Sequence, residues 1–217
     1  MTKIFIAIPT GGMVHAGYLL FFQNIRKIEK YADYEININV VTSARTPENR
    51  NKLIKKFLAT DCNWFLHLDA DNVPPQNLLD MIDNDVDICS AVYYVWMEKR
   101  LVPLAMTRRG KSNRYTQFNK EVPDNQYLIE VDGVGGGGLL IKREVLETIK
   151  PPWFKDVFNK EGDKRVLGND FYFCQKAQSA GFKIWVDLRI FLKHYHEIEM
   201  NELHDWIRDS FVMKQWK

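Results

Sequence analysis

The segment WFLHLDAD, residues 64–71, places two aspartates directly after a short run of bulky, mostly apolar residues. The run predicts a buried strand, and the prolines Pro74 and Pro75 mark a stop behind it. Because residues two apart in an extended chain point to the same side, Asp69 and Asp71 direct their carboxylates together. In open α/β sheets ligands bind in the crevice at the carboxyl ends of the strands, so this segment is the first candidate site.

Short apolar runs alternate with longer amphipathic ones on either side of this segment, which is typical of strands alternating with helices. Strands are expected at 3–8, 35–41, 63–68 and 87–93, with helices at 15–31 and 47–59. The pattern predicts an α/β fold with a mostly parallel open sheet and helices on both faces.

The second half of the chain changes character and predicts a small antiparallel region. Strands are expected at 101–106, 127–134, 139–141 and 183–186, with helices ending at Ile149 and spanning 169–180. A polar, basic stretch at 108–125 is expected to be a mobile loop that could close over a ligand. Residues 199–217 predict an amphipathic terminal helix, which packs on the domain or, alternatively, contacts a membrane surface or a second copy.

The composition excludes several functional classes. The 217 residues hold 30 Lys and Arg against 28 Asp and Glu, a net charge of +2, too small to indicate a nucleic-acid partner. The three cysteines are odd in number and far apart, so they predict neither a disulfide framework nor a metal knuckle and favour a reducing compartment. Because no apolar run is long enough for a signal peptide or a membrane span, a cytoplasmic location is expected.

Two carboxylates in one crevice repel each other unless a cation or a shared proton relieves them, and hard divalent ions such as Mg²⁺ and Mn²⁺ prefer oxygen ligands. The pattern Asp-x-Asp also occurs at 83–85 and 85–87, where a helix end and a turn predict solvated side chains. The chain has no GxxxxGK[ST] loop and no GxGxxG after its first strand. A metal on Asp69 and Asp71 would therefore be the means of neutralising a bound diphosphate.

The segment WFLHLDADN, residues 64–72, resembles the DxD segment of GT-A-fold glycosyltransferases, in particular the family-2-like enzymes and their small phage and viral relatives. The resemblance implies one GT-A-like domain over 1–217, with a nucleotide-binding half at 1–100 and an acceptor and catalytic half at 101–217. If such a chain is viral, its expected location is the host cytoplasm. The matching segments, in the order of the family, are IAIPT at 6–10, NRN at 49–51, WFLHLDADN at 64–72, VDGVGGGGLLI at 131–141, GNDFYFC at 168–174, and WVD at 185–187 followed by His194.

The resemblance implies a metal site. Asp71 is expected to bind Mn²⁺ or Mg²⁺ directly, and Asp69 to contact the ribose or sugar of the donor or to reach the metal through water. His194 is the candidate third ligand, with His196 as the alternative, and an imidazole among oxygens favours Mn²⁺.

The resemblance also implies the other roles. Pro9, Thr10 and Arg50 are expected at the nucleotide, with Arg50 either neutralising phosphate or holding the acidic pair. Gly136 and Gly137 are expected to let the donor sugar approach the backbone, unless they form only a bulge.

Asp170 is the candidate general base, at the start of a helix where the macrodipole also favours an anion. Two positions depart from the family: Asn169 replaces the usual glutamate, and four consecutive glycines are more uniform than usual.

Together these features predict a metal-dependent transfer of a hexose from a nucleotide-diphosphate sugar, expected to be UDP-linked, to a hydroxyl group of a glycan or another acceptor. With Asp170 as base, a single displacement would invert the anomeric centre. The alternatives are a non-catalytic binding module of the same fold, a metal-dependent sugar-phosphate nucleotidylyltransferase and, more remotely, a glycoside hydrolase with two carboxylates.

Overall fold

The computed structural model describes residues 1–42, 46–97, 100–110 and 112–197, together with Met200, Asn201, Leu203, His204 and Ile207. The terminal helix expected from residue 199 lies mostly outside the described residues.

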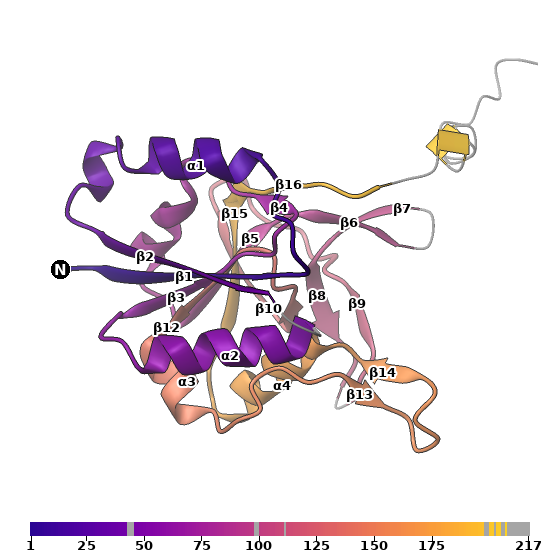
Figure 1. The fold of residues 1–217 in the computed structure, drawn as a ribbon. Helices are drawn as coiled ribbons and strands as arrows, with labels where there is room; N and C mark the ends of the chain where they lie inside the picture. Colours follow the sequence, from indigo (N-terminus) through magenta and orange to yellow (C-terminus); the bar gives the residue numbers. More distant parts are fainter. Residues whose placement is uncertain are drawn as a thin grey trace, which may run out of the picture.

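A seven-stranded sheet forms the centre of the molecule, with strand order β10-β15-β5-β12-β3-β1-β2 (Figure 1). Parallel pairing joins β1 to β2 and β3, and β15 to β5, whereas β12 and β10 run in the opposite direction. Five strands therefore point one way and end at one edge, which confirms the mostly parallel sheet. The strands are β1 (Lys3–Thr10), β2 (Glu35–Thr42), β3 (Trp64–His67), β5 (Ile88–Val92), β10 (Leu128–Val131), β12 (Leu139–Lys142) and β15 (Ile184–Phe191).

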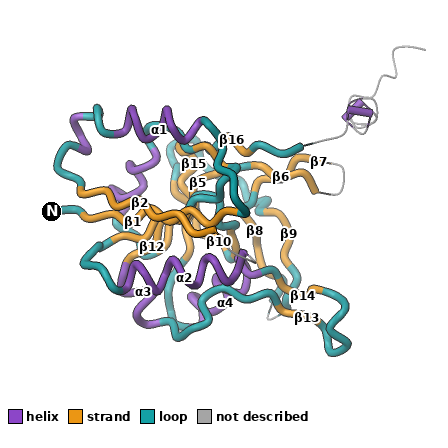
Figure 2. Tube along the Cα trace, in the orientation of Figure 1, coloured by secondary structure: helices purple, strands orange, loops and turns teal. Residues whose placement is uncertain are grey.

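Helices cover both faces of this sheet (Figures 1 and 2). Side chains alternate along β1: Ile4, Ile6 and Ile8 pack with α1 (Gly17–Ile25), and Phe5 and Ala7 pack on the opposite face with α2 (Thr46–Leu58). The α2 face also holds α3 (Arg143–Thr148) and α4 (Asn169–Ser179). The α1 face is completed by two 3₁₀ helices, Glu29–Tyr31 and Leu78–Asn84.

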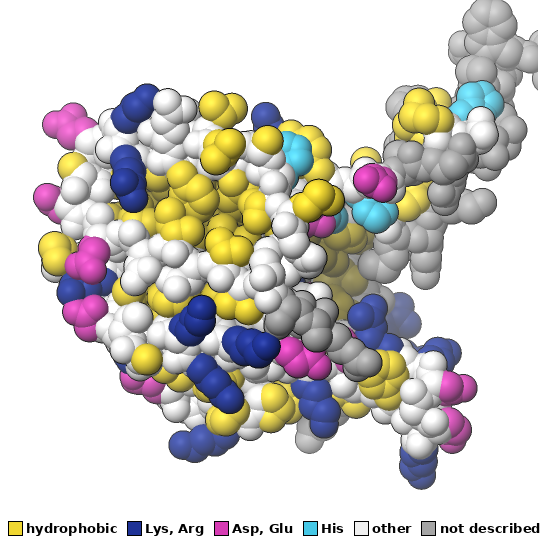
Figure 3. Space-filling model, viewed as in Figure 1, with side chains coloured by type: hydrophobic (Ala, Val, Ile, Leu, Met, Phe, Trp, Pro, Cys, Tyr) yellow, Lys and Arg dark blue, Asp and Glu magenta, His cyan; other side chains and the backbone are white. Residues whose placement is uncertain are grey.

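Helix α2 shows how the sequence pattern produces this layer. Leu53, Ile54 and Phe57 are fully buried against the sheet, and lysines occupy the opposite side of the helix. Figure 3 shows basic side chains gathered over α2, where Lys52, Lys55 and Lys56 are exposed. One apolar stripe and one charged stripe at helical spacing are what an amphipathic surface helix requires.

Short antiparallel strands surround the carboxyl edge of the sheet, as expected for the second half of the chain. The stretch 108–125, expected as a loop, instead includes β9, which pairs with β8 in a hairpin. The Arg108 N–H donates to Asp132 at 2.8 Å, which fixes the end of β8 next to the turn of that hairpin. These strands are β4 (Asn72–Val73), β6 (Tyr94–Met97), β7 (Arg100–Pro103), β8 (Ala105–Arg108), β9 (Tyr115–Gln117), β11 (Gly133–Val134), β13 (Val157–Phe158), β14 (Arg165–Leu167) and β16 (Lys193–His194).

Other sequence expectations hold with small shifts. The helix expected at 15–31 is divided into α1 and the 3₁₀ helix Glu29–Tyr31, and Gly181 follows α4 with a φ of +93°, the left-handed conformation expected at a helix end. All three cysteines are free and buried. Within the described residues, no helix is both long and apolar enough to span a membrane.

Asp187 is a fully buried carboxylate on β15, and its stability contribution depends on pH. Burial opposes its ionisation, but hydrogen bonds from Arg189 at 2.7 Å and Asn84 at 2.8 Å outweigh burial, so the pKa of Asp187 is lowered. A lowered carboxyl pKa stabilises the fold above the unfolded-state value of about 3.9, and that stabilisation is lost as the pH falls through the folded-state pKa.

We predict that Asp187→Asn lowers the free energy of unfolding by about 2 kcal/mol at pH 7, because the charged hydrogen bonds are lost. The difference from wild type should shrink towards pH 3, since only the wild-type side chain titrates. Urea unfolding followed by circular dichroism measures both values, with the exposed Asp124→Asn as control. A deficit that is constant from pH 7 to pH 3 would contradict this account.

Candidate active site

A cavity of about 1020 Å³ opens at the carboxyl ends of β1, β3 and β5. Its wall is completed by the segment after β15, because the pairing of β16 with β4 places His194 opposite Asn72. The polar side chains that line it are Thr10, His15, Thr46, Asn49, Arg50, Asp69, Asp71, Asn72, Tyr93, His194, Tyr195, His196 and Glu197.

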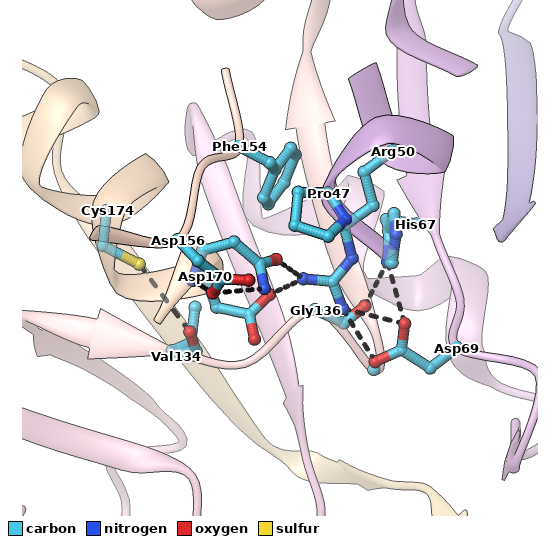
Figure 4. A network of polar contacts seen from close by, with 12 residues as sticks. Pro47, Arg50, His67, Asp69, Val134, Gly136, Phe154, Asp156, Asp170 and Cys174 are labelled. Carbon is cyan, nitrogen blue, oxygen red and sulfur yellow. Dashed lines mark hydrogen bonds and ion pairs between the residues drawn. The ribbon is translucent and has the colours of Figure 1, made fainter. Parts of the chain in front are cut away.

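The guanidinium of Arg50 is the centre of the polar network in this region (Figure 4). Only 3% of the side chain is exposed, and Nη2 donates to both oxygens of Asp69, at 2.9 and 3.1 Å. Nη1 donates to the side-chain oxygens of Asn169 and Asp170 at the start of α4. Arg50 thus joins α2, the end of β3 and the first turn of α4, and its two Nη atoms donate to two carboxylates and one amide oxygen.

The charges in this network depend on one another. Burial opposes the charged form of Arg50, but Asp170 and Asp69 outweigh it, so the pKa of Arg50 is raised. Burial also opposes ionisation of Asp69, yet Arg50 and His67 hold its pKa below the ordinary value. At Asp170 burial prevails over the attraction of Arg50, and the pKa of this carboxyl is raised. A raised pKa makes Asp170 the better proton acceptor of the two carboxylates.

His67 is a buried structural histidine beneath the site. Its side chain is fully buried and its Nδ1 bonds the carbonyl oxygen of Gly136. Burial and the nearby Arg50 lower the pKa of His67 to about 4, so the ring is neutral at physiological pH.

The backbone of the Asp69–Asn72 turn is fixed from α1. Tyr18 is 3% exposed, and its hydroxyl oxygen lies 2.7 Å from the carbonyl oxygen of Asp69 and 3.0 Å from the carbonyl oxygen of Asn72. The N–H of His15 donates to the carbonyl of Ala70 at 2.9 Å. These contacts hold the two aspartates at the cavity wall without using their carboxylates.

Asp71 and His194 form a second polar pair, separate from Arg50. The His194 Nε2 lies 3.6 Å from Asp71 Oδ2, and the His194 Nδ1 lies 2.7 Å from the carbonyl oxygen of Tyr94. The neighbouring carboxylate raises the pKa of His194. More than half of the Asp71 side chain remains exposed, so this pair is open to the cavity.

The donor set tests whether a divalent cation fits. A carboxylate oxygen and an imidazole nitrogen 3.6 Å apart are suitable ligand types for Mn²⁺, and ions bound by few protein ligands complete their shells with water and substrate phosphate. Asp69 has both oxygens on Arg50, which leaves Asp71 and His194 as the available pair. Within the described residues, no group of three or more His, Cys, Asp or Glu side chains is placed to hold a metal. A cation here would therefore depend on bound substrate for further ligands.

The remaining predicted site residues lie in different places. Pro9 and Thr10 line the cavity, but the Thr10 hydroxyl bonds within its own turn, donating to the Met13 carbonyl and accepting from the Gly12 N–H. Asp170 lies behind Arg50, outside the cavity lining given above, with 29% of its side chain exposed.

Gly136 and Gly137 are buried beside the cavity and do not line it. An added Cβ at Gly136 would lie 2.6 Å from Arg50 Nη2, and one at Gly137 would lie 2.8 Å from the Tyr93 ring. These glycines therefore make room for protein side chains.

Tyr93 and Tyr195 are aromatic residues of the site that no sequence motif marks. Tyr93 follows β5, and Tyr195 follows β16 and stacks on His15 with ring centroids 3.8 Å apart. The available signal for Tyr93 was its position after a buried strand, since the carboxyl ends of parallel strands meet at one edge. For Tyr195, the pairing of β16 with β4 was needed.

Comparison with known proteins supports the fold. No family model matches the sequence, and no curated protein matches it. Among solved structures, A197 from STIV superimposes with a TM-score of 0.60 and 22% identity, over 91% of this chain and 87% of that chain. GalNAc-T7, solved with UDP, GalNAc and Mn²⁺, superimposes with a TM-score of 0.59 and 10% identity. The match covers 96% of this chain and 48% of GalNAc-T7.

The chain therefore has the GT-A-like fold that its sequence resemblance implied. At these identities the comparison establishes the fold, and the chemistry must be argued from the site itself.

We predict that Arg50→Met lowers the free energy of unfolding by about 3 kcal/mol, because removing one partner leaves Asp69 and Asp170 as unpaired, partly buried charges. Urea unfolding at pH 7 measures the loss. Lys55→Met, on the exposed side of the same helix, is the matched control and should change stability by less than about 0.5 kcal/mol. Equal losses in the two variants would contradict the central role of Arg50.

Proposed function

We propose that this protein is a metal-dependent glycosyltransferase that moves a sugar from a nucleotide-diphosphate donor to a hydroxyl acceptor. The observation that carries the proposal is the division of the acidic residues at one sheet edge. Asp71 faces His194 in an open cavity, whereas Asp69 and Asp170 are joined by the buried Arg50. One carboxylate is thereby available to a cation, and a separate carboxylate of raised pKa is available to a proton.

Asp71 and His194 are the residues that would hold the cation. When bound, Mn²⁺ or Mg²⁺ supplies positive charge that offsets the charge of a diphosphate leaving group. The UDP-linked donor is proposed from the family resemblance, and the fold shared with GalNAc-T7, solved with UDP, GalNAc and Mn²⁺, is consistent with it. Pro9 and Thr10, at the end of β1, would lie against the nucleotide.

Asp170 would act as the general base. Among the described residues only its Oδ1 is engaged, by Arg50, which leaves Oδ2 to accept a proton. The acceptor hydroxyl gives that proton to Asp170, its oxygen bonds the anomeric carbon, and the bond from that carbon to the diphosphate oxygen breaks. A single displacement of this kind inverts the anomeric centre.

Arg50 and Asp69 would position these groups. Because Nη1 and Nη2 donate to Asp69, Asp170 and Asn169, Arg50 is suited to holding the acidic residues, one of the two roles expected for it. Asp69, whose oxygens accept from Arg50, would contact the ribose or sugar of the donor.

The free, buried cysteines suit a reducing compartment such as the cytoplasm.

We predict that UDP or a UDP-sugar raises the melting temperature only when Mn²⁺ is present. A nucleotide at 100 times its Kd adds about 2.7 kcal/mol, which corresponds to roughly 5–10 °C in a chain of this size. A thermal-shift panel of nucleoside diphosphates and sugar nucleotides, each with and without Mn²⁺, makes the measurement.

Asp71→Asn and His194→Ala should abolish this metal-dependent shift. Asp85→Asn, in a second Asp-x-Asp match where Asp85 is exposed and already has a left-handed φ, is the matched control and should retain it. Shifts that are the same with and without Mn²⁺, or no response to any nucleotide, would contradict the proposed function.

We predict that Asp170→Asn lowers turnover at least 100-fold, the usual contribution of a positioned base, and leaves the Kd for UDP with Mn²⁺ within about threefold. Release of the nucleoside diphosphate measures turnover, and calorimetry measures binding. Asp163→Asn, exposed beyond β13, is the control. A non-catalytic module would bind nucleotide with no turnover in the wild type, and a hydrolase without metal would keep full activity in EDTA.

A further inference from the structure

Two glycines of the run Gly135–Gly138, Gly135 and Gly137, lie against the side chain of Tyr93. All four glycines are described, and none has a left-handed φ, so backbone conformation does not explain them. The lack of space for a side chain explains Gly135 and Gly137. An added Cβ at Gly135 would lie 1.9 Å from Tyr93 Oη, and one at Gly137 would lie 2.8 Å from two atoms of the Tyr93 ring. We call Gly135 and Gly137 the tyrosine socket.

The socket orients the hydroxyl as well as the ring. The Gly137 N–H donates to Tyr93 Oη at 3.1 Å, so one lone pair of the phenol is used. No described residue accepts the phenolic proton, although the side chain is only 4% exposed. Burial, together with Asp69 and Asp170, raises the pKa of Tyr93 well above its ordinary value, so the hydroxyl keeps its proton at neutral pH. A buried donor without an acceptor is costly unless a ligand or water completes it.

The position of the hydroxyl indicates which part of a ligand it would meet. The Tyr93 ring meets His194 edge to face, with centroids 5.6 Å apart, and thus borders the proposed cation pair. Its Oη lies at Gly135 and Gly137, on either side of Gly136, which is itself in contact with Arg50 and close to Asp170. Tyr93 therefore extends from the side that would hold the diphosphate to the side of the base, where the transferred sugar would lie.

We propose that Tyr93 is a positioning residue for the donor sugar, and that its phenolic O–H donates a hydrogen bond to a sugar hydroxyl in the cavity. The inference rests on the proposed function and adds a residue to it. It also gives Gly137 a different role from the one expected: together with Gly135 it seats the tyrosine that would contact the sugar.

The first test separates the sugar from the nucleotide. Calorimetry with Mn²⁺ compares UDP, UDP-glucose and UDP-N-acetylglucosamine on wild type, Tyr93→Phe and the control Tyr94→Phe, whose side chain is exposed. Tyr93→Phe should weaken binding of the sugar nucleotide that the wild type binds best by about tenfold, as expected for one hydrogen bond, and change UDP affinity less than twofold. Tyr94→Phe should match the wild type.

Other results have distinct meanings. If Tyr93→Phe lost the same affinity for UDP as for the sugar nucleotide, the hydroxyl would contact the diphosphate and the inference would be overturned. Unchanged sugar-nucleotide affinity in Tyr93→Phe would also overturn it. If wild type bound none of the three probes, the proposed function would fail and this inference with it.

The second test needs no ligand. Gly135→Ala should lower the melting temperature more in the wild type than in Tyr93→Phe, because phenylalanine lacks the Oη that the new methyl group would meet. Leu104, whose Cδ1 would lie 2.6 Å from the same methyl group, contributes equally in both backgrounds. If Gly135→Ala lowered the melting temperature equally in the wild type and in Tyr93→Phe, the role of the tyrosine socket would be contradicted.

Discussion

The buried positive charge of Arg50 is the constraint on which the site depends. A guanidinium that is 3% exposed must be paired, and its partners are Asp69, 19 residues away, and Asp170, 120 residues away. Satisfying one side chain therefore fixes the end of β3 and the start of α4 relative to α2. The sheet brings these segments to one edge, and the charge determines how closely they meet.

This constraint also separates the two aspartates of the DAD sequence. Their spacing directs both carboxylates to one side, which by itself indicates a symmetric pair. In the structure Asp69 accepts from Arg50, whereas Asp71 faces His194 across 3.6 Å. The same short motif thus serves two purposes: one aspartate belongs to the charge network, and the other remains open to the cavity.

Much of the fold could be predicted from the sequence because periodicity and strand ends are local signals. The alternating runs located β1, β2, β3, β5, α2 and α4 to within a few residues. The antiparallel insertion of β12 between β3 and β5 could not be predicted, because four apolar residues carry no information about direction. The β8–β9 hairpin was missed because its polar, basic sequence is also typical of an exposed loop.

The site residues that belong to a sequence motif could be predicted. Those whose position depends on packing between segments far apart in the chain could not. Asp69 and Asp71 were predicted from their position after a strand, and Arg50 and His194 from the family resemblance. The structure brings all four to one cavity. The two roles open to Arg50 could not be separated, since spacing along a helix does not show where a guanidinium points. Tyr93 belongs to no motif, and Gly137, which lies against it, was expected to let the donor sugar approach the backbone.

We propose that Asp71 and His194 hold a divalent cation next to a nucleoside diphosphate. Anomalous diffraction at the manganese edge, from crystals containing Mn²⁺ and UDP, tests it most directly. We predict one strong peak within bonding distance of Asp71 Oδ2 and His194 Nε2 and next to the diphosphate. A peak bound elsewhere, or UDP in the cavity with no manganese at this pair, would contradict it.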